Sequence, residues 1–110
     1  SKGVNMPKFT ARYASGATEE FSYTPLMVIA GYEVHKLALH KDGLGHWIVS
    51  HPVLGYQVCS VNGIYKGIRV SSKGFTKKEI LQLAQSDVDA LINRVGSEKF
   101  NQVIAKGKCK

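Results

Sequence analysis

The chain has 110 residues, of which 44% are hydrophobic and 21% charged, and its formal net charge at pH 7 is +7. This composition is typical of one globular domain and excludes a disordered chain, and no apolar run is long enough to span a bilayer as a helix. The excess of Lys and Arg favours a polyanionic partner such as DNA, RNA or an acidic protein surface, without choosing among them.

The two cysteines, Cys59 and Cys109, lie in unlike surroundings, the first in an apolar stretch and the second in a lysine-rich end. Because a domain of this size folds without a disulfide, we expect two free thiols and therefore a reducing compartment. The start of the sequence lacks the apolar segment of a signal peptide. We expect a cytoplasmic protein.

Residues 1–7 have no periodicity, and we expect them to be disordered or to have been added to the natural chain. From Lys8 to Tyr13 apolar and polar residues alternate, which predicts a half-buried strand. The strand stops at the Ser15-Gly16 turn signal, and residues 19–23 are the predicted partner strand of a first hairpin.

The next predicted strands lie between residues 26 and 61. The run 26–30 is continuously apolar but too short for a helix, so it predicts a buried strand, and Gly31 then marks a bulge or bend before an extended segment to residue 40. Asp42-Gly43 is a turn signal ahead of a strand at 46–50.

The strongest local signal is Asn62-Gly63, because this dipeptide supplies the two positive φ angles of a type I′ turn. It predicts a hairpin that joins a strand at 56–61 to a strand at 64–70.

The hydrophobic period changes at Thr76, where a capping box precedes the single apolar stripe of a helix at 77–95. Gly96 ends this helix, and Ser97 can cap a second, short helix at 98–105. The predicted fold is α+β: a twisted antiparallel sheet of about five or six strands, with the first helix packed on one face and the second closing an end. Residues 8–105 form the single domain and residues 106–110 a basic tail.

Residues 66–78 contain five cations and no acid. Lys77 and Lys78 fall in the first helical turn, where the macrodipole is positive, so a bound anion would offset their unfavourable position. Tyr65 stands next to this segment and could stack on an unpaired base. The predicted nucleic-acid-binding residues are Lys66, Arg69, Lys73, Lys77, Lys78 and Tyr65; the alternative is a solvated face that serves solubility.

The segment from Trp47 to Tyr56 is apolar and aromatic, and Pro52 and Gly55 interrupt it, as expected of a bulged edge strand. An apolar edge can dock a protein partner by strand addition or side-chain insertion. The residues that would do so are Trp47, Val53, Leu54 and Tyr56. The alternative is a core strand that leaves the sheet.

Four histidines fall within 17 residues, but His35 and His40, like His46 and His51, are five apart and point to opposite faces of a regular strand. We therefore expect no metal and no cofactor. No nucleophile motif or paired carboxylates indicate a reaction, so we favour a non-enzymatic function.

The sequence favours a small basic protein that holds a polyanion, most simply nucleic acid, through residues 66–78. The alternative is an inhibitor or accessory module that docks on an acidic protein surface through residues 47–56. The identity of the partner and the oligomeric state stay open.

Overall fold

The computed structural model describes residues 7–43, 45–61, 64–65, 68–69 and 75–106. The predicted α+β class is confirmed. Along this part of the chain the elements are, in order, β1 (Lys8–Arg12), β2 (Thr18–Ser22), β3 (Thr24–Ala30), β4 (Glu33–Lys41), β5 (Trp47–Ser50), β6 (Gln57–Ser60), β7 (Ile64–Tyr65), β8 (Ile68–Arg69), α1 (Lys77–Val95) and α2 (Ser97–Lys106).

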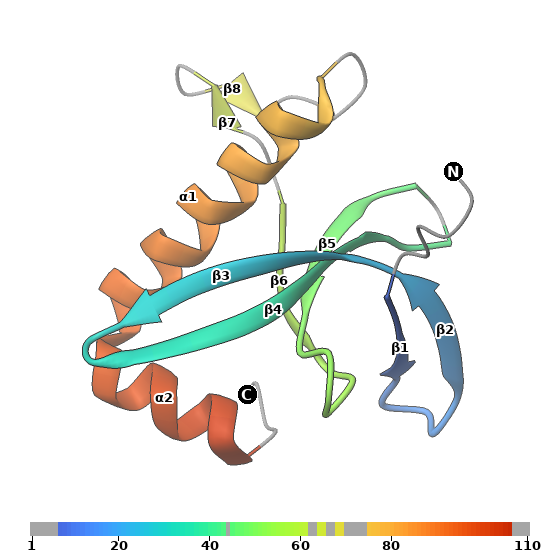
Figure 1. The fold of residues 1–110 in the computed structure, drawn as a ribbon, viewed down its shortest axis with the longest axis horizontal. Helices are drawn as coiled ribbons and strands as arrows, with labels where there is room; N and C mark the ends of the chain where they lie inside the picture. Colours follow the sequence, from blue (N-terminus) through green and yellow to red (C-terminus); the bar gives the residue numbers. More distant parts are fainter. Residues whose placement is uncertain (1–6, 44, 62–63, 66–67, 70–74, 107–110) are drawn as a thin grey trace.

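The main strands are divided between two antiparallel sheets, one of two strands and one of four (Figure 1). The predicted first hairpin is present as β1–β2, and β3, β4, β5 and β6 follow one another across the larger sheet. The expectation of a bulge or bend at Gly31 is wrong: Gly31 and Tyr32 form the turn of the long β3–β4 hairpin. Gly31 has a φ of 66°, which glycine adopts without the strain that a side chain would bring.

The apolar run at 26–30 lies in the predicted strand, β3, but only alternate residues of it are buried. Leu26, Val28 and Ala30 face the core, whereas Met27 and Ile29 are 53% and 66% exposed. The helices cover the face that carries Leu26 and Val28. The run is therefore apolar on both faces although one face is partly open.

The first helix, α1, has the predicted bounds, and both hydrogen bonds of the capping box are present. The Glu79 amide donates to Thr76 Oγ1 at 3.2 Å, and the Thr76 amide donates to Glu79 Oε1 at 2.8 Å. The buried stripe of α1 packs on the four-stranded sheet and consists of Ile80, Ala84, Val88 and Ile92.

The second helix, α2, begins at Ser97, so this residue lies inside the helix and not before it as expected. Phe100 and Ile104 of α2 are buried in the same core as α1. Of the helices in the described part of the chain, neither is long and apolar enough to cross a membrane.

The β1–β2 hairpin covers part of the sheet face that α1 leaves open. Phe9 and Ala11 pack there against Ala38 of β4 and against Tyr23. The remainder of that face, toward the β3–β4 turn, is exposed at Met27, Ile29 and Val34.

The expectation of one continuous strand at 64–70 is wrong. β7 and β8 pair with each other, with Ile64 opposite Arg69 and Tyr65 opposite Ile68, so the chain reverses within this segment. The predicted turn at Asn62-Gly63 lies outside the described residues.

The expectation that the segment 47–56 is an edge strand is also wrong. β5 pairs with β4 on one side and with β6 on the other, which places it inside the sheet. Pro52 lies in the turn between β5 and β6, where the ladder needs no amide donor from it.

Candidate functional site

The start of α1 is the part of the predicted basic patch whose side chains the structure describes. Lys77 and Lys78 occupy its first turn and are both exposed. Neither ammonium group forms an ion pair with a carboxylate in the described residues. The capping box already satisfies the amides of Thr76 and Glu79, so an anion at this end would be held by the lysine side chains and not by those amides.

The remaining predicted residues of the patch are described less fully. The backbones of Tyr65 and Arg69 belong to β7 and β8, which lie at the end of the molecule where α1 begins (Figure 1). Tyr65 and Arg69 therefore lie on two different strands, and they are not opposite each other in the pairing. Lys66 and Lys73 lie outside the described residues.

Acidic side chains in the middle of α1 limit the length of a basic surface along this helix. Asp89 is exposed and its Oδ1 accepts a hydrogen bond from Gln85 at 3.2 Å, and Asp87, two residues earlier, is half-buried. The next cation, Arg94, is in the last turn, roughly 25 Å from Lys77 at the usual helical rise. A polyanion therefore meets favourable charge at either end of α1 but not along its whole length.

Two of the four residues in the predicted protein-binding segment are used for packing. Trp47 is partly buried against the main core. The Tyr56 hydroxyl donates to the Ile104 carbonyl oxygen at 3.1 Å, which ties the chain just before β6 to α2. Val53 and Leu54, in the turn between β5 and β6, are 80% and 38% exposed and remain available to a partner.

A serine and a histidine that the sequence analysis did not connect form a buried pair. His40 Nε2 lies 2.8 Å from Ser50 Oγ across β4 and β5, and His40 Nδ1 lies 3.1 Å from the Lys41 carbonyl oxygen. A neutral ring satisfies both contacts, since it donates from Nδ1 and accepts the Ser50 hydroxyl proton at Nε2.

The surroundings of His40 explain its protonation state. Its ring packs against those of Phe9 and Phe21, with centroid distances of 4.8 and 4.7 Å. Burial lowers the pKa of His40 because it disfavours the charged ring. Since Ser50 is only 3% exposed, we assign the pair to the packing between the two sheets. The sequence alone does not indicate the His40–Ser50 pair, because the two residues come together only through the register of β4 and β5. The adjacent residues Ser50 and His51 point to opposite faces of the strand.

A second histidine, His35, is likewise engaged in structural contacts. His35 lies on the opposite face of β4 from His40, and its Nε2 is 2.6 Å from Asn101 Oδ1. The Asn101 amide donates in turn to the Ala30 carbonyl oxygen at 3.0 Å, which joins the β3–β4 hairpin to α2. In the described part of the chain, no three His, Cys, Asp or Glu side chains come together as metal ligands would.

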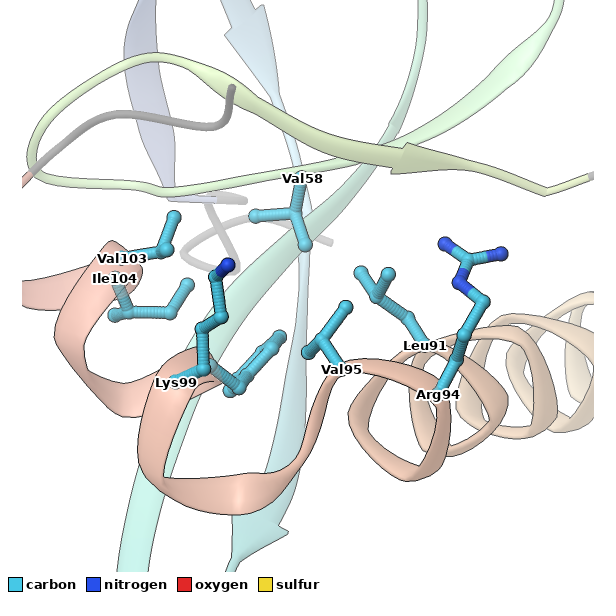
Figure 2. A pocket seen from close by; sticks show the side chains of 8 residues that line it. Val58, Leu91, Arg94, Val95, Lys99, Val103 and Ile104 are labelled. Atoms are coloured by element: carbon cyan, nitrogen blue, oxygen red, sulfur yellow. The ribbon is translucent and has the colours of Figure 1, made fainter.

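A groove of about 310 Å³ lies between β6, the end of α1 and α2 (Figure 2). Arg94 and Lys99 line it together with apolar side chains and extend from the two helices on the side where Val58 lies (Figure 2). No local sequence signal predicted this groove, because its walls come from three separate parts of the chain. The apolar lining residues are Val58, Leu91, Val95, Phe100, Val103 and Ile104.

Comparison of the chain with protein-family models, with curated proteins and with solved structures finds no match.

Proposed function

We propose that this chain is a small non-enzymatic binding protein that holds a polyanion, most simply nucleic acid, at the start of α1. The observation that carries the proposal is the pair of exposed lysines, Lys77 and Lys78, which meet no carboxylate among the described residues. Both are unfavourable beside the positive end of the helix macrodipole, and a phosphate bound there would offset this repulsion, because the lysines and the macrodipole both attract it.

Lysine ammonium groups bind phosphate as point charges and do not read base edges in the way that a planar guanidinium does. The proposed contact is therefore to the nucleic-acid backbone, with little sequence preference and a strong dependence on salt. The net charge of +7 adds long-range attraction that steers a polyanion toward the molecule. The proposed compartment is the cytoplasm, where the thiol of Cys59 would stay reduced.

Two charge-reversal variants test the site. The first is the double variant Lys77→Glu, Lys78→Glu, at the start of α1, and the second is the double variant Arg94→Glu, Lys99→Glu, near the end of α1. The two variants change the net charge equally. Fluorescence anisotropy with labelled single-stranded and duplex DNA and RNA measures their affinities. We expect the Lys77/Lys78 variant to bind at least about tenfold more weakly than the Arg94/Lys99 variant. Equal losses would mean that only net charge matters and that the start of α1 is not the site.

The second candidate is a protein-binding module, and the exposure of Val53 and Leu54 favours it. Exposed apolar side chains in a turn can insert into a partner's surface. A capture experiment from native lysate, run with and without nuclease, separates the two functions. Capture that survives nuclease and is lost in the Val53→Ser, Leu54→Ser variant supports a protein partner, whereas capture that nuclease abolishes supports nucleic acid.

A further inference from the structure

The groove between β6, α1 and α2 combines an apolar interior with two cations. Arg94 comes from the last turn of α1 and Lys99 from the first turns of α2, and both are exposed. Neither forms an ion pair with a carboxylate in the described residues. The neighbouring acid, Glu98, does not line this groove but an adjoining shallow hollow over the α1–α2 junction, which shares Val95 and Lys99 with the groove. The groove therefore offers positive charge beside an uncovered apolar surface.

The size of the groove indicates what can fill it. A water molecule accounts for about 30 Å³ of liquid volume, and a methylene group is of similar size. The volume of about 310 Å³ thus accommodates on the order of ten chain atoms. A single alkyl chain of about that length fits such a space.

We propose that this groove binds a carboxylate with one alkyl chain of about eight to ten carbons. The chain lies against Val58, Leu91 and the other apolar side chains, and the carboxylate is held by Arg94 and Lys99 at the side of the groove. A neutral chain would leave both cations without a partner, and an alkylammonium would be repelled by them. This site is independent of the proposed polyanion site, because Lys77 and Lys78 are at the other end of α1.

Calorimetric titration with three ligands of equal chain length tests the charge requirement. Decanoate, decanol and decylammonium share the same alkyl chain and differ in the head group. We expect decanoate to bind roughly three- to tenfold more tightly than decanol, as is typical of exposed charge pairs, and decylammonium to bind weakest. Amide chemical-shift changes caused by decanoate should centre on Val58, Leu91 and Val103. Equal affinities for all three ligands, absence of binding, or shift changes elsewhere in the molecule would overturn the proposal.

Variants locate the head group and the chain separately. Arg94→Gln with Lys99→Gln should reduce decanoate affinity to that of decanol and leave decanol binding unchanged, while the matched Lys77→Gln, Lys78→Gln control should change neither. Val103→Phe, which fills the groove without altering charge, should weaken both ligands, with circular dichroism verifying the fold. Equal effects of the two glutamine variants on decanoate, or full binding by Val103→Phe, would contradict the site.

Discussion

Leu26 and Met27 are neighbours on β3, and their side chains face opposite sides of the sheet. Leu26 is 5% exposed in the core beneath α1, whereas Met27 is 53% exposed on the partly open face. Leu26→Ala removes the branched end of the leucine side chain from the interface between sheet and helix and leaves a cavity. We therefore expect the free energy of unfolding to fall by about 2–5 kcal/mol. Met27→Ala removes the same number of heavy atoms from a half-solvated site and should cost less than about 1 kcal/mol.

Urea denaturation followed by far-UV circular dichroism measures both variants against the parent. With a slope of about 1–3 kcal/mol per molar urea, typical of small domains, the Leu26 variant should show a midpoint lower by about 1 M or more. The Met27 variant should unfold close to the parent. Equal losses at the two positions would refute the assignment of the Leu26 face to α1, because the two truncations differ mainly in the side of the sheet that they affect.

Three further changes probe other contacts. Thr76→Ala should lower the free energy of unfolding by about 0.5–2 kcal/mol through loss of the cap to the Glu79 amide, and unchanged thermal stability would contradict the capping box. Gly55→Ala should cost more than Gly16→Ala in the same measurement, because both have positive φ but only at Gly55 would a Cβ collide with the Thr10 carbonyl oxygen. Burial lowers the pKa of His40 in the folded state below its ordinary value of 6.5. The neutral ring therefore contributes fully to stability above pH 6.5, and this contribution is lost as the pH falls from 6.5 through the folded-state pKa. Urea midpoints should therefore fall more steeply below pH 6.5 for the parent than for His40→Gln, and parallel curves would contradict this role.

The features that the sequence predicted correctly are set by residues close together in the chain. The capping box needs only Thr76 and Glu79, and the stripe of α1 recurs with the helical period, so the bounds 77–95 could be predicted without knowledge of the rest of the fold. The first hairpin is equally local, since its strands flank the Ser15-Gly16 turn.

The features that the sequence did not predict depend on distant contacts. Continuous apolar character at 26–30 does not tell which face of β3 meets the helices, and Pro52 by itself does not distinguish an edge strand from a turn between paired strands. The His40–Ser50 contact needs the β4–β5 register. The groove needs Val58, Arg94 and Lys99 to be brought together by β6, α1 and α2. Such sites become visible only when the packing of the elements is known.

The dependence of nucleic-acid affinity on salt tests the proposed polyanion site most directly. The logarithm of the association constant for duplex DNA should fall linearly with the logarithm of salt concentration, by about 0.9 for each phosphate contact. Lys77→Gln with Lys78→Gln should reduce that slope by about 1.8, the equivalent of two contacts, while Arg94→Gln with Lys99→Gln should leave it close to that of the parent. A slope that is the same in the parent and in the Lys77/Lys78 variant would contradict binding of phosphate at the start of α1.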